Sequence, residues 1–295
     1  MEFPYGTIVT DPPPNFAPPE MWPEYGHIAD PAPICKREKI SADPAGIRWS
    51  LWPLCFEEYV GDTEPNIQKS SAGLLAYNRL ALWRRVRRND TPVGWHESRK
   101  NTSRTDGYQL LPPTGDFTKS WTKSARRNLS MWKKSFLNIS HTIETIGLEE
   151  YATAYRHSLI AKRVDTARLA ELQHKVTGPL TDTKKHTEYW GVRDVSTKKI
   201  IAGTAVIFSP TFKSSTHFAP FIHEEARHID AATGLVYHWF EVARSRNMLC
   251  VMTTNFWRPG KPKNWKGFSD FKARFGFEYV TYPPVLWRFV RGKFL

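Results

Sequence analysis

The order of the expected helices and strands places this 295-residue chain in the mixed α/β class, with helices on both faces of a mostly antiparallel sheet. Two observations support this class. From residue 148 onward the hydrophobic pattern predicts helix, helix, strand, strand, strand, helix, strand, helix, strand, strand. Hydrophobic residues make up 40% of the chain and aromatic residues 14%, which can fill a sizeable core and excludes a wholly disordered chain.

The first third of the chain has the weaker patterns. Residues 1–33 are dense in proline, which removes backbone donors, so an extended arm is expected there. Short apolar runs at 47–54 indicate one or two strands. Residues 70–88 repeat apolar side chains at three and four positions and predict a helix with arginines crowding its C-terminal end. The polar, turn-rich residues 89–117 are expected to connect it to the rest.

The remaining elements are more clearly marked. Helices are expected at 121–134, at 148–159 and after Asp165, the last with Leu169, Leu172 and Val176 on one face. Strands follow at 189–195, 199–208 and 215–222. A long helix over 231–248 leads into a strand at 249–256. A short helix carrying Phe268, Phe271 and Phe275 stops at Gly276, and strands at 277–281 and 285–290 close the chain as an antiparallel pair.

The net charge of +13 points to a polyanionic partner. The excess lies in two blocks, residues 79–134 (net +10) and 258–295 (net +7). RNA and an anionic membrane surface both suit such blocks, and simple solubility is the alternative explanation. Three scattered cysteines predict no disulfide frame, and no apolar run suggests a signal peptide or a membrane span. A cytoplasmic protein is therefore expected.

Three stretches of the second half resemble a known family. The basic segment Arg126-Arg127-Asn128-Leu129 with Lys133-Lys134 precedes the paired helices. Residues 233–239 (TGLVYHW) begin the long helix, and residues 271–277 (FKARFGF) lie near the end. Together, over roughly residues 118–295, they resemble the C-terminal lobe of the Fem-type aminoacyl-tRNA-dependent transferases and the related Fem-like acetyltransferases. The resemblance implies a GNAT-like acyltransferase fold.

The resemblance also implies a domain organisation. Fem-type proteins commonly carry two GNAT-like lobes, and the first would have to lie in residues 34–117, which are short for a complete lobe. We therefore expect a proline-rich arm (1–33), a truncated or degenerate first lobe (34–117) and a C-terminal GNAT-like acyltransferase domain (118–295).

The densest titratable chemistry lies in residues 217–228. Acyl transfer to an amine needs a base for the attacking nitrogen and donors for the developing oxyanion. His217, on an expected strand, and Glu224 and Glu225, just after it, are the candidate catalytic residues; a solvated turn is the alternative for each. Strand alternation places His217 opposite Phe218, facing either the groove or a covering helix.

The turn before the long helix is where CoA-dependent members of the fold hold a pyrophosphate on backbone N–H groups. Arg227 and His228 suit a substrate-binding turn, but Asp230 stands where a glycine is expected. A carboxylate there competes with phosphate, and its simpler role is to cap the helix. The missing glycine weakens CoA as the acyl donor.

Further candidates follow the strand that would border the acyl groove. Asn255 and Trp257 are candidate substrate-binding residues, although tryptophans more often pack in the core. Cations interleaved with aromatic residues suit nucleic acid, with an ordinary exposed surface as the alternative. The candidate nucleic-acid-binding residues are Arg126, Arg127, Lys133, Lys134, Arg258, Lys261, Lys263, Lys266 and Lys272.

No metal site and no covalent nucleophile are expected. His223 and His228 are five positions apart rather than four, and Glu224 is misplaced for a zinc site. The chain contains no GxSxG, P-loop or CxxC motif.

The sequence therefore predicts an acyltransferase without a tightly bound cofactor. By the resemblance, it moves an aminoacyl or other acyl group from aminoacyl-tRNA to an amine. Acetyl-CoA is the alternative donor, and a non-catalytic RNA-binding module on the same scaffold is the alternative of another class. The expected partner is tRNA or another RNA, with peripheral contact to an anionic membrane as a further option. The acceptor stays open among a cell-wall precursor, a peptide N-terminus and a small molecule.

Overall fold

Two sheets organise the computed structural model, and each belongs mainly to one of two units. Unit 1 comprises Met1–Thr7, Pro23–Gly26 and Asp106–Tyr279, and unit 2 comprises Ile8–Trp22, His27–Thr105 and Val280–Leu295. The structure describes residues 3–9, 16–19, 22, 25, 36–40, 45–51, 54–61, 63–67, 78–85, 87, 90–98, 104–137, 140–163, 167–177, 183–261 and 263–291. Unit 1 thus differs from the predicted domain 118–295 at both ends.

The strands of unit 1 follow the order β13-β7-β12-β11-β10-β9-β8. Their bounds are β7 Thr105–Leu110, β8 His141–Thr145, β9 Thr187–Asp194, β10 Ile200–Ser209, β11 Ser214–Ile222, β12 Cys250–Thr253 and β13 Glu278–Thr281. The pairs β8/β9, β9/β10, β10/β11 and β7/β12 are antiparallel, whereas β11 and β12 are parallel. The parallel pair requires a crossover, and the long helix between the two strands supplies it.

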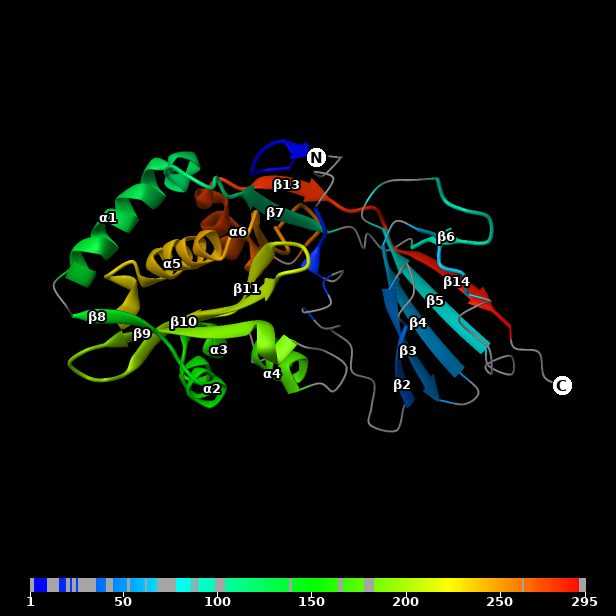
Figure 1. The fold of residues 1–295 in the computed structure, drawn as a ribbon, viewed down its shortest axis with the longest axis horizontal. Helices are drawn as coiled ribbons and strands as arrows, with labels where there is room; N and C mark the ends of the chain where they lie inside the picture. Colours follow the sequence, from blue (N-terminus) through cyan, green and yellow to red (C-terminus); the bar gives the residue numbers. More distant parts are fainter. Residues whose placement is uncertain are drawn as a thin grey trace. The chain divides into compact units, whose positions relative to one another are not determined.

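Helices cover both faces of this sheet (Figure 1). On one face lie α1, Lys123–Leu137, and the crossover helix α5, Ala231–Ser245. On the other lie α2, Leu148–Arg156, α3, Leu159–Arg163, and α4, Ala167–Thr177. A short helix, α6, Lys266–Lys272, continues as a single 3-10 turn and ends at Gly276, whose φ of 69° is left-handed. The predicted mixed α/β class is confirmed.

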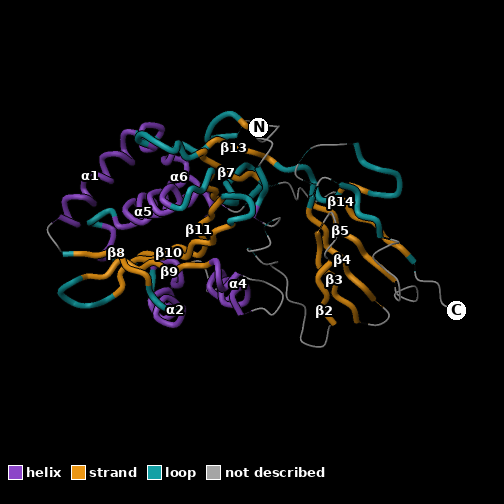
Figure 2. Tube along the Cα trace, viewed as in Figure 1, coloured by secondary structure: helices purple, strands orange, loops and turns teal. Residues whose placement is uncertain are grey.

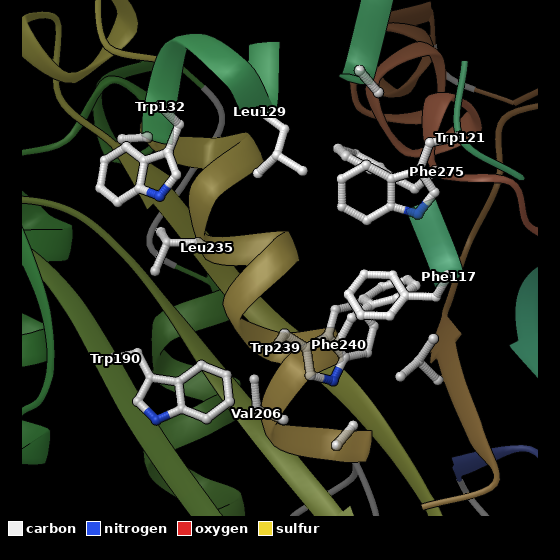
Figure 3. Packing of buried hydrophobic residues seen from close by; sticks show 14 of the residues in the cluster. Phe117, Trp121, Leu129, Trp132, Trp190, Val206, Leu235, Trp239, Phe240 and Phe275 are labelled. Atoms are coloured by element: carbon white, nitrogen blue, oxygen red, sulfur yellow. The ribbon is translucent and has the colours of Figure 1, made fainter. Parts of the chain in front are cut away.

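The core of unit 1 lies between the sheet and its α1–α5 face (Figure 3). Trp190 and Val206 of the sheet face Leu235 and Trp239 of α5, all buried. The Trp132 ring of α1 packs on the backbone of α5 at Gly234, where an added Cβ would lie 2.4 Å from that ring. Only glycine permits this contact, so the helix that begins at residue 231 is fixed in place by α1.

Unit 2 is built on a six-stranded sheet in the order β2-β3-β4-β5-β14-β6. The strands are β2 Lys36–Ile40, β3 Ala45–Leu51, β4 Leu54–Val60, β5 Asn78–Arg84, β6 His96–Glu97 and β14 Leu286–Val290. β4 and β5 are parallel, and the other neighbours are antiparallel. Its described residues form strands and loops without an α-helix (Figure 2). One face carries a small core around Tyr59, Trp83 and Leu286.

Several predictions for the first third of the chain are wrong. Residues 78–84, predicted as helix, form strand β5, while 71–77 lie outside the described residues. Arg79, Ala81 and Trp83 are buried in alternation, so pairing in the sheet overrides the apparent helical period. The predicted connection at 89–117 contains β6 and β7. Of the proline-rich arm, only residues 3–9, 16–19, 22 and 25 are described, and they include the two-residue strand β1, Ile8–Val9.

The end of the chain also differs from expectation. The strands predicted as a closing antiparallel pair, now β13 and β14, belong to different sheets, because β14 pairs with β5 and β6. Strand β12 ends at Thr253 rather than at residue 256. The helices α1, α2, α4 and α5 and the β9/β10 hairpin occur where predicted, within a few residues; Asp165 itself lies outside the described residues.

Candidate functional site

The sheet of unit 1 opens between its two parallel strands. β11 and β12 are paired at Ser214, Ser215 and Thr216 only, opposite residues 250–252. β11 continues six residues further, to Ile222, whereas β12 ends one residue further, at Thr253. Beyond Thr216 the edge of β11 that faces β12 therefore has no described strand paired to it. Such an opening exposes strand backbone to a ligand in the interior of a sheet.

A bulge bends β11 beside this opening. Its pairing with β10 passes from Ala205↔Phe218 to Gly203↔Phe221, so β11 has one extra residue there. Ala219 takes up the bend at a φ of 44°, in the left-handed region that alanine rarely adopts. The hydroxyl of Tyr151, on α2, donates a hydrogen bond to the Ala219 carbonyl. The bend is therefore held by α2, on the face of the sheet that α1 and α5 do not cover.

His217 lies at the point where the two strands part. Its Nε2 is 2.9 Å from the Thr253 hydroxyl, and its ring centroid is 5.1 Å from that of Trp239 on α5. Burial, and then the nearby charge of Lys272, lower the pKa of His217 to about 3. The imidazole is therefore neutral at neutral pH. It is also too weakly basic to hold a proton there, which counts against its predicted role as the general base.

Lys272 brings a cation to the same place from the last turn of α6. Its Nζ donates to the carbonyl of Thr254 at 2.5 Å and lies 3.5 Å from that of Asn255, on the two residues after β12. Burial lowers the pKa of Lys272 to about 8; the charge of Asp106 opposes this shift and that of Arg168 adds to it. An amine with this pKa exchanges a proton close to neutral pH.

The backbone after β12 is shaped for this contact. Asn255 has a φ of 61°, and its N–H donates to the Asp106 carboxylate at 2.9 Å. Asp106 is fully buried on β7, so it orients the turn whose carbonyls receive Lys272. Asn255, a predicted substrate-binding residue, thus lies in the turn that borders the opening.

The α4 side of the opening carries further cations and aromatic rings. Lys175 is 2% exposed, and its Nζ lies 3.9 Å from the ring centroid of Tyr25. The Tyr25 ring meets Phe218 of β11 edge-on at 6.3 Å, and the Arg168 guanidinium lies 5.8 Å from the Phe218 ring. Arg168 is paired with Glu171 at 2.8 Å. The opening is therefore bordered by positive charge from α4 and α6, next to the rings of Tyr25 and Phe218.

The other predicted catalytic and binding residues of 224–230 lie apart from this group. Glu224 and Arg227 are exposed and pair with each other at 3.0 Å, and Glu225 and His228 are exposed as well. No described hydrogen bond or ion pair joins any of them to His217 or Lys272. These residues therefore fit the alternative of a solvated turn better than a catalytic role.

Asp230 occupies the N-cap position of α5, but its side chain makes no capping hydrogen bond. Its backbone is left-handed, with φ 55° and ψ 34°, so the carboxylate is not directed at the first N–H groups of the helix. The predicted side-chain cap is therefore wrong. Burial raises the pKa of Asp230, and the charges of Arg127 and Arg274 oppose that rise.

The predicted nucleic-acid contacts fall into two groups. Arg126, Arg127, Lys133 and Lys134 are exposed along α1, with Lys133 over the Tyr237 ring. Lys263 and Lys266 are exposed on and before α6, and Arg258 and Lys261 are half-buried in the preceding loop. The Thr122 N–H donates to the Arg274 carbonyl, so the beginning of α1 lies beside the end of the α6 segment. Lys272 differs from the rest, because it points into the turn at Thr254.

Trp257 is bound within its own loop. Its indole N–H donates to the Lys261 carbonyl at 3.1 Å, and its backbone N–H donates to the Ser269 hydroxyl at 2.7 Å. The half-buried ring therefore holds the 257–261 loop against α6. This fits the packing alternative better than the predicted substrate-binding role.

The sequence did not point to Asp106 or Thr253 as site residues. Asp106 precedes Asn255 by 149 positions, and the two meet only because β7 pairs with β12. Among the described residues, no group of three His, Cys, Asp or Glu side chains is arranged to hold a metal ion. The described helices include none that is both long and apolar enough to cross a bilayer.

Known structures share this architecture, although no protein-family model and no curated protein sequence matches the chain. The crystal structure of FemX aligns with 87% of this chain and 88% of its own at a TM-score of 0.60 and 10% identity. The C-terminal domain of a putative lysylphosphatidylglycerol synthetase from Agrobacterium fabrum aligns with 86% of this chain and 84% of its own, at a TM-score of 0.52 and 10% identity. A conserved protein of unknown function from Bacteroides thetaiotaomicron aligns with 88% of this chain and 87% of its own, at a TM-score of 0.51 and 10% identity.

These similarities establish the fold. The chain shares the fold of FemX and of the synthetase domain over most of its length, as the resemblance of residues 118–295 to the Fem-type proteins predicted.

Proposed function

We propose that this chain is an acyltransferase that moves an aminoacyl group from tRNA to an amine. The observation that carries the proposal is the opening between β11 and β12, where Lys272 stands close to a neutral His217 and to the part of β11 that no described strand pairs on this edge. Acyl transfer without a covalent intermediate asks for this combination. The protein must orient two substrates and stabilise the oxyanion that forms between them.

Lys272 suits the charge that develops in this reaction. The amine nitrogen attacks the ester carbonyl, a C–N bond forms, and the carbonyl oxygen becomes an oxyanion. When the oxyanion collapses, the ester C–O bond breaks and the carrier leaves through its ribose oxygen. An ammonium group has three N–H donors, and two point at the carbonyls after β12. The third is directed at the oxyanion in our proposal.

The proton balance gives Lys272 a second role. The attacking nitrogen loses one proton and the leaving oxygen gains one. A lysine with a pKa of about 8 can donate to the leaving oxygen and be restored by the nitrogen, because its pKa lies close to the working pH. His217, with a pKa of about 3, takes the role of a positioning residue that fixes the Thr253 hydroxyl.

The turn before α5 favours tRNA over CoA as the donor. A pyrophosphate cradle needs backbone N–H groups that are directed at the ligand. In this turn the N–H groups of Ala226, Arg227 and Asp230 are donated to carbonyls of the same turn, at 3.1–3.4 Å. The carboxyl of Asp230 adds a like charge beside the first turn of α5. We therefore rank acetyl-CoA second, after aminoacyl-tRNA, as the acyl donor.

The basic residues of α1 and the α6 segment supply the affinity for a polyanionic carrier. Arg126 and Arg127 on α1 and Arg274 after α6 lie on adjoining segments, which suits contact with one phosphate backbone. One of the similar structures is a domain of a putative lysylphosphatidylglycerol synthetase, whose product carries an aminoacyl group. By analogy we expect an amine acceptor and a reaction in the cytoplasm, where charged tRNA is available; a cell-wall precursor, a peptide N-terminus and a small molecule are all consistent with it.

A transfer assay tests the proposal. tRNA charged with radiolabelled amino acids is incubated with the protein and a panel of amine acceptors, and transfer is followed by mass spectrometry. Lys272→Met is expected to lower kcat at least about a hundredfold, the usual loss for one oxyanion donor. Lys199→Met, which changes an exposed lysine of the β9–β10 turn, is the control with unchanged rate.

Two outcomes would replace the proposal with one of its rivals, and a third would overturn its mechanism. Turnover with acetyl-CoA but not with charged tRNA would identify the alternative donor. Tight, salt-dependent RNA binding without transfer to any acceptor would favour the non-catalytic RNA-binding module. Full activity of Lys272→Met would remove Lys272 from the mechanism.

A further inference from the structure

Lys272 lies over an aromatic ring that takes no part in the proposed reaction. Its Nζ is 5.0 Å from the ring centroid of Phe256, which is 2% exposed. A cation at such a distance is attracted to the face of the ring. β7 packs on the same ring, because an added Cβ at Gly107 would lie 2.7 Å from it. The position of Phe256 therefore helps to decide where the ammonium group stands.

A segment far away in the sequence packs on Phe256. The rings of Phe3 and Tyr5 lie 6.5 Å and 5.7 Å from the Phe256 ring, and Phe3 also meets Tyr279 edge-on at 5.0 Å. Phe256 and Tyr279 are in contact as well, at 4.9 Å. Phe3 and Tyr5 are half-buried, whereas Phe256 and Tyr279 are buried. The rings of residues 3 and 5 thus form the outer layer of a four-ring cluster, and Lys272 lies against a buried member of it.

Tyr5 also holds the helix that carries Lys272. Its hydroxyl donates to Oδ1 of Asp270 at 2.9 Å, and Asp270 lies on α6 two residues before Lys272. The same carboxylate accepts from the Lys266 ammonium at 2.9 Å and 3.0 Å. Burial, and then the hydrogen bond to Asp270, raise the pKa of Tyr5 to about 12. The hydroxyl therefore remains a donor throughout the neutral range of pH.

The helix α6 depends on such contacts because it has only seven residues. A helix of this length is not stable by itself, so the segments packed on it decide its position. It is tied at Ser269, whose hydroxyl accepts the backbone N–H of Trp257, and at Asp270, which accepts from Tyr5. These ties fix the helix from which Lys272 reaches the turn after β12.

We propose that Phe3 and Tyr5 are positioning residues for Lys272, which hold its ammonium group at the Thr254 carbonyl through Phe256 and through α6. An oxyanion donor accelerates a reaction only when it is fixed in place before the charge develops. The two residues thus contribute to the rate without touching a substrate. This catalytic consequence rests on the proposed function, whereas the placement of the ammonium group can be measured without the reaction.

The charged and titratable groups that act on Lys272 come from other elements. Asp106 on β7 and Arg168 on α4 shift its pKa in opposite directions, and His217 on β11 is neutral. Substitutions at residues 3 and 5 leave these groups in place and change the burial of Lys272, which is the main cause of its lowered pKa. Removal of either ring is therefore expected to raise the pKa of Lys272 from about 8 toward 10.5.

Competitive acetylation of the full chain with trace acetic anhydride, over a series of pH values, measures this pKa. Peptide mass spectrometry follows Lys272 separately from the other lysines. Phe3→Ala and Tyr5→Ala are each expected to raise the pKa of Lys272 by about one unit, a tenfold change in its proton affinity. Tyr5→Phe keeps the ring and should leave the pKa unchanged. Phe212→Ala is the matched control, because Phe212 is a half-buried ring of the same unit in the turn between β10 and β11.

The transfer assay tests the contact with α6 separately. Tyr5→Phe loses the hydrogen bond to Asp270, so kcat is expected to fall at least about fivefold with KM for charged tRNA unchanged, since a small displacement of a positioned group lowers a rate by such factors. A double-mutant cycle shows whether the two residues act through one contact: in the Asp270→Asn chain, Tyr5→Phe is expected to have no further effect. Phe212→Ala is expected to keep the wild-type kcat. Circular dichroism confirms that each variant is folded.

Three results would overturn the proposal. One is a pKa of Lys272 that is the same in the wild type, Phe3→Ala and Tyr5→Ala. Another is an equal rise in Phe212→Ala, which would indicate a general loosening of unit 1. The third is a wild-type kcat for Tyr5→Phe in a chain that transfers the aminoacyl group. If the wild-type chain transfers no acyl group, the proposed function fails, and the acetylation experiment still decides whether residues 3 and 5 position Lys272.

Discussion

Lys272 is expected to make the stability of the protein depend on pH in a way that Lys272→Met removes. Burial lowers the pKa of its ammonium group from 10.5 to about 8 in the folded chain. Each pKa unit is worth about 1.4 kcal/mol, so at neutral pH the buried charge costs the folded state about 3 kcal/mol. This cost is fully present below pH 8, where the folded and unfolded chains both carry the proton.

The sign of the effect follows from which state loses its proton first. Between pH 8 and 10.5 the folded chain releases the Lys272 proton while the unfolded chain keeps it. The free energy of unfolding therefore rises with pH over this window, in the wild-type chain only. The difference between wild type and Lys272→Met should shift by about 3 kcal/mol in favour of wild type from pH 7.5 to pH 10.5.

Urea unfolding of both proteins at a series of pH values measures this difference. Other lysines and tyrosines titrate in the same range, but they are common to both chains and cancel. Lys199→Met, at an exposed lysine, is expected to show a flat difference from wild type. A flat difference for Lys272→Met would refute the reasoning, because it would mean that Lys272 keeps its ordinary pKa and is not enclosed beside the opening.

Three further substitutions test the backbone around the site, with a fourth as a control. Gly234→Ala is expected to lower the free energy of unfolding by about 1–3 kcal/mol, because the new Cβ would lie 2.4 Å from the Trp132 ring. The control Gly267→Ala, with nothing within 4 Å, should instead raise it by up to about 1 kcal/mol. Asp230→Gly should also raise it, by up to about 1 kcal/mol, because no side-chain cap is lost and the left-handed backbone suits glycine. Ala219→Gly is expected to gain about 1 kcal/mol for the same backbone reason, and to slow transfer if the bulge positions the substrates. Urea unfolding measures all four, and the transfer assay measures the last.

The elements of unit 1 were the more predictable part of the fold because their signals are local. The β9/β10 hairpin has two runs rich in apolar residues around a short polar turn, and α5 has one apolar face. Gly276 ends the α6 segment as expected for a left-handed glycine. Each of these signals lies within about twenty residues of sequence.

The prediction for the first third of the chain, a helix where strand β5 lies, was wrong because this strand carries apolar residues on both faces. In β5, Leu80 and Leu82 lie partly buried on one face while Ala81 and Trp83 are buried on the other, so the alternation of apolar and polar residues that marks a half-buried strand is absent. The prediction missed β7 because a polar segment is buried there. Its residues Thr105-Asp106-Gly107-Tyr108-Gln109 are mostly polar yet buried, because the strand lies in the interior of the sheet.

Of the candidate site, the sequence could indicate residue types but not their grouping. His217 was singled out from its strand and does lie at the opening, with a pKa far below the value that its predicted role needs. Lys272 was placed among surface cations, because nothing in its helix shows that the side chain meets the carbonyl of Thr254. That contact depends on where β12 ends, which the pairing with β11 and β7 decides.

The backbone itself singles out the same opening. Six described residues other than glycine have a left-handed φ, and three of them are Lys198, Lys213 and Asn247, at turns that join one element to the next. The other three are Ala219, Asp230 and Asn255. Ala219 and Asn255 lie at the bulge of β11 and just after β12, which border the opening, and Asp230 lies at the start of α5. Such conformations cost on the order of 1–2 kcal/mol each for a residue with a Cβ and persist only where the surrounding structure holds them. Here the Tyr151 hydroxyl holds the first and the Asp106 carboxylate the third. The strained backbone at the two borders of the opening is thus held by hydrogen bonds from neighbouring elements, which is the pattern expected where a structure keeps such residues for a site.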